Sequence, residues 1–327
     1  MSIGLMLVLL LILASEFVNG WTDSPNAIAT VVSTRVMKPK YAVVLATVCN
    51  VIGAFLGTEV AKTIGTGIVK PEAINLVTVG AAMVGIVAWS VVAWYFGLPT
   101  SESHALVAGL AGAGLATAGP SVLLWEGWKK VLIGLGFSSV LGVLGGYGIA
   151  WLIQQLFKNM NRQKSKSLFA VLQTISAGAM ALSHGSNDGQ KFIGTFTLAL
   201  VLGGVIEEFH VQSWTILLCS LIMGLGTSVG GWRIIKTMGA KMVRLETYQG
   251  FAAEASASGS ILLASHLGIP LSTTHTINTS IMGVGAATRL SAIRWGVVGE
   301  MVTAWILTFP ICAIIGYVVA IFFKWIF

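Results

Sequence analysis

Two short polar motifs each occur twice in this chain, inside strongly apolar stretches. The first pair consists of NGWTD at residues 19–23 and HGSND at residues 184–188, and the second of PTSESH at residues 99–104 and PLSTTH at residues 270–275. Glycine, proline, aspartate and histidine are costly in a helix that faces lipid, because they expose backbone or charge to a medium that cannot solvate them. We therefore interpret the paired motifs as the lining of a binding site.

The second pair has the chemistry of an anion site. In both copies hydroxyl groups follow a proline at the start of a predicted helix, and they belong to Ser101, Ser103, Ser272, Thr273 and Thr274. Such hydroxyls and the unpaired amides of a helix N-terminus can converge on the oxygens of an oxyanion, where the helix dipole also favours negative charge. Helix capping alone would explain any one of these residues. Two matched clusters favour substrate binding.

The acids of the first pair, Asp23 and Asp188, predict that a cation takes part. A carboxylate repels an anion unless a proton or a metal cation intervenes, so paired acids suit a coupling ion or protonation linked to substrate binding. Helix capping in polar turns is the alternative. Glu59 and Glu254 also interrupt apolar runs. We expect them either to take part in ion coupling or to lie at a membrane boundary.

The residues next to the two aspartates complete the expected substrate site. Asn26, Asn187 and Gln190 offer neutral hydrogen-bonding groups. Lys191 offers a cation that can pair with Asp188 or with the substrate.

His104 and His275 occupy matched positions directly after the hydroxyl clusters, and we expect them to orient those clusters or to make structural hydrogen bonds. No close-spaced pair of ligands accompanies them, so no permanent metal site is expected. Ser101, His104 and Asp23 show neither a nucleophile elbow nor a paired metalloprotease helix. Duplication of every polar element also argues against one asymmetric catalytic site, so the sequence predicts that the protein is not an enzyme.

The composition predicts an all-α polytopic membrane protein. Of the 327 residues, 55% are hydrophobic and only 9% are charged, which is too little polar surface for a water-soluble globule of this size. The formal charge of +7 is uninformative, because basic cytoplasmic loops give a similar sum in many inner-membrane proteins. Cys49, Cys219 and Cys312 match no metal or disulfide spacing and are expected to be buried apolar side chains.

Apolar runs separated by charged clusters predict ten membrane crossings. They cover residues 2–34, 41–62, 73–97, 103–119, 131–157, 168–206, 213–232, 248–268, 272–287 and 295–327. The first and sixth runs are too long for one straight span of about 20 residues, and each has its aspartate motif near the middle. Pro25 and Gly189 are the expected breaks, so we expect two broken helices or re-entrant hairpins.

The matched motifs keep their order at offsets of 165 to 171 residues, which predicts two repeats of about five crossings each. The repeats are residues 1–157 and 168–327, joined by a basic linker at 158–167. Residues 35–40 are basic, whereas their counterpart at 207–210 is acidic. By the positive-inside rule the repeats therefore have inverted topology, with the linker in the cytoplasm and both termini outside.

The quoted motifs resemble those of the inorganic phosphate transporter (PiT) family. Residues 19–30 resemble the first signature of that family, and residues 184–191 resemble the second signature in its bacterial branch. The paired segments at 99–104 and 270–275 resemble its serine-rich hairpins. The resemblance covers essentially residues 15–290.

The resemblance implies a secondary active symporter of inorganic phosphate, carried alone or as a metal-phosphate complex, with H⁺ or Na⁺ as the coupling ion and no other cofactor. It also implies alternating access with the substrate at the membrane midplane between the repeats, and a homodimer in the cell (plasma or inner) membrane. No nucleic-acid partner is expected. Carried across by motif, Asp23, Asn26, Asp188 and the hydroxyl clusters form the substrate and ion site.

Two positions depart from an even repeat. Lys191 stands where the first signature has Asn26, and Glu102 stands where the second hairpin has Thr273. The two half-sites are therefore expected to differ.

A sulfate or other oxyanion permease of the same family, or an anion channel without ion coupling, remains an alternative. A protonated phosphate can donate a hydrogen bond to Asp23 or Asp188, whereas sulfate at neutral pH cannot. The two carboxylates therefore favour phosphate.

Overall fold

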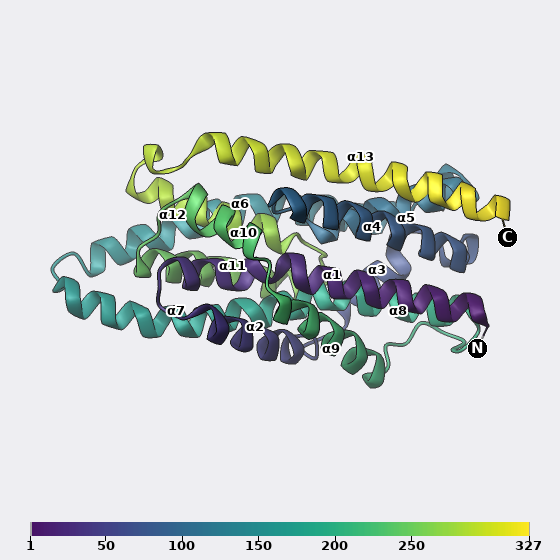
Figure 1. The fold of residues 1–327 in the computed structure, drawn as a ribbon, viewed down its shortest axis with the longest axis horizontal. Coiled ribbons are helices and arrows are strands. Elements are labelled where there is room, and N and C mark those ends of the chain that lie inside the picture. Colours follow the sequence, from purple (N-terminus) through teal and green to yellow (C-terminus); the bar gives the residue numbers. More distant parts are fainter. Residues whose placement is uncertain (1, 327) are drawn as a thin grey trace.

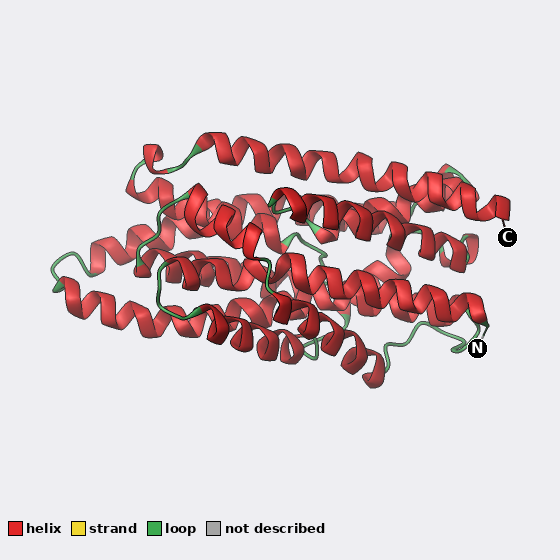
Figure 2. Ribbon diagram, in the orientation of Figure 1, coloured by secondary structure: helices red, strands yellow, loops and turns green. Residues whose placement is uncertain are grey.

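The computed structural model describes residues 2–326, and in this part of the chain the fold consists of helices joined by loops (Figure 2). The helices run along the long axis of an elongated bundle (Figure 1). The α-helices are α1 (Ile3–Ser33), α2 (Pro39–Gly53), α3 (Glu59–Gly67), α4 (Leu76–Phe96), α5 (Glu102–Ala118), α6 (Trp125–Leu156), α7 (Arg162–His184), α8 (Gln190–Leu202), α9 (Ser213–Val229), α10 (Trp232–Lys236), α11 (Thr247–His266), α12 (Thr273–Thr288) and α13 (Trp295–Ile326). Two π-helical turns, Gly185–Gly189 and Thr237–Met242, continue α7 and α10.

The ten predicted apolar runs lie mostly on helix, although the run at 41–62 is divided between α2 and α3. Fewer helices than predicted are able to cross a membrane unaided. Five described helical segments are long and apolar enough, or six if α9 and the short segment after it, which bend by 59°, count as one span. Four of the predicted runs account for the difference. Helices α2, α5 and α12 have only 15, 17 and 16 residues, less than the length of a full span, and α11 has 20 residues but is not apolar enough. Helices α5 and α12 pack as hairpins against α4 and α11, respectively.

The predicted break at Pro25 is wrong, because α1 continues through it. A proline removes one backbone N–H and leaves the carbonyl four residues earlier without its donor. That carbonyl belongs to Trp21, and the hydroxyl of Ser24 donates to it at 3.2 Å. A side chain thus compensates the lost hydrogen bond, as is common for proline in membrane helices.

The predicted break at Gly189 is also wrong. A continuous run of 41 residues, Arg162–Leu202, contains this glycine. The turn Gly185–Gly189 is a π-helical turn, wider than an α-helical one, and the helix continues through it. Such π-bulges are frequent at functional sites. The real interruptions lie elsewhere: Gly97, Gly230 and Gly268 have φ of 71°, 71° and 64°, which is why the chain turns after α4, α9 and α11.

The two halves of the chain pack on each other reciprocally. Helices α4 and α5 lie along α13, and α11 and α12 lie along α6. The backbones approach closely at two matched glycines, because a Cβ on Gly112 would overlap the carbonyl oxygen of Ala313 and one on Gly283 would overlap that of Val143. Each short helix of one half is therefore seated on the long last helix of the other half.

Helix α1 begins and helix α13 ends at the same end of the bundle, and the turn between α6 and α7 lies at the opposite end (Figure 1). Helix α7 begins at Arg162, so the second part of the predicted linker, residues 162–167, is helical. Met1 and Phe327, the outermost residues of the predicted repeats, lie outside the described residues.

Candidate functional site

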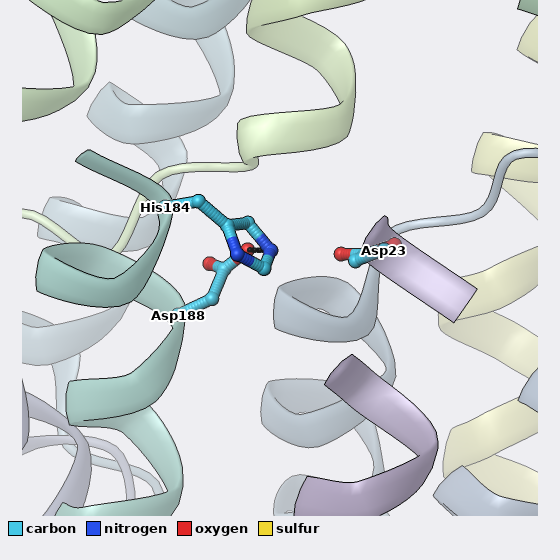
Figure 3. A group of neighbouring side chains, drawn as sticks. All are labelled: Asp23, His184 and Asp188. Carbon is cyan, nitrogen blue, oxygen red and sulfur yellow. Dashed lines mark ion pairs between the residues drawn. The ribbon is translucent and has the colours of Figure 1, made fainter. Parts of the chain in front are cut away.

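Asp23 on α1 meets His184 and Asp188 near the junction of α7 and α8 (Figure 3). All three side chains are buried, and one ligand atom of each lies within 4.8 Å of the others. The fold thus joins the two copies of the first motif, which are far apart in sequence. We call these three residues the aspartate cluster.

Asp188 is held by donors from several helices. Lys191 and Thr273 donate to its two carboxylate oxygens, and the Ser103 hydroxyl lies 3.4 Å from Oδ1. The Nε2 of His184 lies 3.2 Å from Oδ2. The carboxylate therefore lies among one ammonium group, two hydroxyls and an imidazole, and Asp188 is only 1% exposed.

Lys191 is 1% exposed and makes three hydrogen bonds with its ammonium group. The acceptors are a carboxylate oxygen of Asp188, the hydroxyl of Ser103 and the carbonyl oxygen of Leu271, the last at 2.8 Å. An ammonium group has three N–H bonds, so each of them has a protein acceptor. The cation is tied to the protein here, and phosphate would have to displace an acceptor to contact it.

Asp23 has much weaker partners than its twin. The Thr274 hydroxyl lies 3.4 Å from both of its carboxylate oxygens. Asn26 donates to Thr274 at 3.0 Å and to Thr273 at 3.3 Å, so it links α1 to the start of α12 without touching Asp23. The predicted inequality of the half-sites agrees with these contacts: Asp188 is saturated with donors, and Asp23 is free to accept one from a ligand.

The hydroxyl clusters divide into two roles. Ser101 and Ser272 are N-caps, accepting hydrogen bonds from the backbone amides of His104 at 3.3 Å and His275 at 3.1 Å. Their contacts match the capping alternative. Ser103, Thr273 and Thr274 instead turn toward the aspartates.

Asn187 and Gln190 support the chain around the aspartate cluster. Asn187 donates to the Ser265 hydroxyl at 3.0 Å and to the Ile269 carbonyl at 3.3 Å. Gln190 accepts from the amide of Val60 at 3.0 Å, at the start of α3. These side chains fix helix ends instead of contacting Asp23 or Asp188.

The two glutamates of the sequence analysis lie apart from the aspartates. Glu59 is exposed at the first turn of α3, where its carboxylate accepts from the amide of Thr58 at 3.0 Å. Glu254 is completely buried and accepts hydrogen bonds from Thr30, Ser176 and Gln173. It belongs to a second polar cluster between α1, α7 and α11.

His104 and His275 face each other, with ring centroids 4.6 Å apart, and pack against aromatic rings of α13. Trp305 lies 3.9 Å from the ring of His275, and Phe309 lies 4.5 Å from that of His104. Their side chains make no described hydrogen bond to the serines; only their backbone amides do. The histidines thus belong to an aromatic contact between α5, α12 and α13.

Three buried polar residues near the aspartate cluster were not predicted from the sequence to belong to the site. Glu102 accepts from Thr22 at 2.9 Å and from Ser90 at 2.7 Å. His184 precedes Asp188 by four residues, a spacing that could have revealed their contact. Glu16 precedes Asn19 by three residues in an apolar run, and this spacing was the available signal.

Residues 19–316 match the phosphate transporter family. The chain belongs to this family. A probable low-affinity inorganic phosphate transporter of Rhizobium meliloti is 43% identical over 303 residues, which cover 92% of this chain and 91% of that protein. One of Bacillus subtilis is 37% identical over 333 residues and 100% of both chains. The resemblance stated from the motifs is confirmed.

A solved structure described as the sodium-dependent phosphate transporter shares the fold of this phosphate transporter family member, with a TM-score of 0.90 over 100% of both chains at 23% identity. The prediction of an all-helical membrane protein is therefore confirmed. Membership of a transporter family also confirms the prediction that the chain is not an enzyme.

Proposed function

We propose that this chain is a secondary active symporter that carries inorganic phosphate across the cell membrane together with H⁺ or Na⁺. The observation that carries the proposal is the aspartate cluster, in which buried acids from matched motifs meet beside the hydroxyls of Ser103, Thr273 and Thr274. The relatives named as probable inorganic phosphate transporters support phosphate as the substrate. The name of the solved structure supports a test of Na⁺ as the coupling ion.

The buried charges support coupling to a cation. Five acidic residues are buried in the described part of the chain, and Lys191 is the one buried lysine or arginine there. The acids are Glu16, Asp23, Glu102, Asp188 and Glu254. An anion cannot enter such a region favourably unless protons or metal cations neutralise part of this charge. Substrate and cation binding are then linked, which is the requirement for symport.

The free acceptor on Asp23 supports phosphate over sulfate. Phosphate at neutral pH carries a proton that it can donate, and the carboxylate of Asp23 has no described donor closer than the Thr274 hydroxyl at 3.4 Å. Sulfate carries no proton at that pH and would leave the carboxylate without a donor. His184 and the two aspartates also form a donor set suited to a divalent cation, so phosphate with a bound metal is a second form to test.

Alternating access between residues 1–157 and 168–327 is part of the proposal. The reciprocal packing of α5 on α13 and α12 on α6 supports two repeats of inverted topology. The common location of both ends, opposite the α6–α7 turn, supports termini on one side of the membrane and the linker on the other. The basic residues of the linker favour the cytoplasm for its side. The site would open alternately to each side between the repeats. The homodimer stays a prediction.

The test is uptake of radiolabelled phosphate into proteoliposomes that carry the whole chain, with an inward gradient of H⁺ or of Na⁺ and with excess unlabelled sulfate as competitor. We expect one of the two gradients to drive phosphate accumulation, and we expect excess sulfate not to inhibit it. Equal uptake with and without either gradient would indicate an uncoupled channel, and strong inhibition by sulfate would indicate a sulfate permease. The same assay with added Mg²⁺ or with a chelator separates free phosphate from its metal complex.

A further inference from the structure

Glu16 is a buried acid that the aspartate cluster does not include. It lies on α1, seven residues before Asp23, which is about two helical turns away. Its side chain is 0% exposed. No lysine or arginine among residues 2–326 lies within ion-pair distance of it.

The hydrogen bonding of Glu16 is incomplete. The side-chain amide of Asn19 donates to Oε2 at 3.0 Å, whereas Oε1 has no partner in the described structure. The amide oxygen of Asn19 is also buried without a partner. Two neighbouring acceptors therefore lack a donor, and a buried carboxylate in this state is strongly unfavourable unless it is neutralised.

A proton fits this place better than a metal cation. A Cβ on Gly189 would lie 3.3 Å from the sulfur of Met223, 3.6 Å from the Cβ of Ala54 and 4.0 Å from Oε1 of Glu16. A thioether and a methyl group thus share the region beside this oxygen, whereas hard cations require about six oxygen ligands. A proton on Oε1 needs one acceptor, and the amide oxygen of Asn19 is available as one.

Charged groups from several helices act on Glu16. The charged side chains near it are Asp188 beside α8, Glu102 on α5 and Lys191 on α8. The thiol of Cys219 on α9 also lies within electrostatic reach. Lys191 is hydrogen-bonded to Asp188. If substrate binding moves or neutralises either group, the electrostatic potential at the Glu16 carboxylate changes.

We propose that Glu16 binds the proton that is transported with phosphate, with the amide oxygen of Asn19 as its hydrogen-bond acceptor. The carboxylate takes a proton from one side of the membrane and releases it to the other, while the aspartate cluster binds and releases phosphate. Glu16 lies beside Gly189, the residue that follows Asp188 in the π-bulge. Protonation of Glu16 therefore affects the aspartate cluster through this packing contact. This inference rests on the proposed phosphate transport.

The experiment compares wild type and Glu16→Gln in two assays on proteoliposomes. The first is phosphate accumulation driven by an imposed pH gradient, and the second is exchange of labelled for unlabelled phosphate at equal pH on both sides. Glutamine keeps the size of glutamate and can donate to Asn19, but it does not titrate. We expect Glu16→Gln to lose gradient-driven accumulation and to keep exchange near the wild-type rate. Glu126→Gln, at an exposed acid of α6, is the control and retains both activities.

Gradient-driven accumulation by Glu16→Gln at the wild-type level would overturn the proposal, as would the loss of exchange in a folded variant. Glu16→Asp provides a second test if the glutamine variant does not fold, because it keeps a titratable group but moves it. Its accumulation should show a shifted pH profile, and an unchanged profile would count against Glu16. If the wild-type protein exchanges phosphate but accumulates it only with a Na⁺ gradient, the role of Glu16 is overturned and the proposed phosphate transport is not. Wild type without any phosphate exchange would overturn the proposed function itself.

Discussion

The ammonium group of Lys191 donates a hydrogen bond of 2.8 Å to the carbonyl oxygen of Leu271. This bond fastens α8 to the extended segment before α12, and the same ammonium group also binds Asp188 and Ser103. At the matched position of the first motif, Asn26 contacts only hydroxyl groups of α12. One half-site therefore carries its own cation, and the other does not.

Lys191→Met should destabilise the protein by about 3–5 kcal/mol, because it leaves Asp188 buried without its cation. The measurement is thermal unfolding in detergent. In the double variant Lys191→Met with Asp188→Asn, part of this loss should return, because the uncompensated charge is gone. If the loss of stability in the double variant equals the sum of the losses in the two single variants, the ion pair does not couple these residues.

Asp23→Asn and Asp188→Asn should both abolish phosphate uptake but differ in stability. Asp23 has one hydroxyl partner at 3.4 Å, so its replacement should change the unfolding free energy by about 1 kcal/mol or less. Asp188→Asn leaves the ammonium group of Lys191 without a counter-ion and should cost about 3–5 kcal/mol. Uptake into proteoliposomes and thermal unfolding measure the two effects. Normal uptake by both variants would refute the proposed site.

Thr274→Val and Ser272→Ala should separate substrate binding from helix capping. Valine keeps the shape of threonine but removes the hydroxyl that lies beside Asp23, so uptake should fall strongly. Ser272 accepts from the backbone amide of His275, so its replacement should lower stability by about 1 kcal/mol and leave uptake intact in the folded protein. The opposite outcome, with transport lost only in Ser272→Ala, would exchange the two roles.

Gly112→Ala should destabilise the bundle by about 1–3 kcal/mol, because the new methyl group would overlap the carbonyl oxygen of Ala313 and separate α5 from α13. Gly148 on α6 has open space around it and serves as the matched control. There alanine should be tolerated or should stabilise the helix by about 0.5–1 kcal/mol. Thermal unfolding of the two variants makes the comparison. Equal stability would show that α5 and α13 can shift apart freely.

The protein class and much of the candidate site could be predicted from the sequence. The apolar composition excluded a soluble globule, and the repeated polar motifs named Asp23 and Asp188 as partners although 165 residues separate them. The structure brings the two aspartates together. The reasoning was that charge and glycine are costly in an apolar run that faces lipid. The motif copies also revealed the difference between Asn26 and Lys191.

Helix continuity could not be read from local signals. Proline and glycine predicted breaks at Pro25 and Gly189, but a hydroxyl from Ser24 and a π-bulge kept both helices intact. Such compensation depends on the neighbouring side chains and on packing, which override the intrinsic preference of one residue.

The sequence by itself determined that this is a helical membrane transporter with two related sets of polar residues, because composition and repeated motifs are properties of the chain alone. Only the tertiary structure decided which of those residues touch. In the folded protein Thr273 donates to Asp188, and Gln190 accepts from an amide at the start of α3. Glu16 is buried and its carboxylate accepts one hydrogen bond. The physical reason is that these contacts depend on how distant helices pack, and a spacing along the chain carries no information about the side chain that will face it across the bundle.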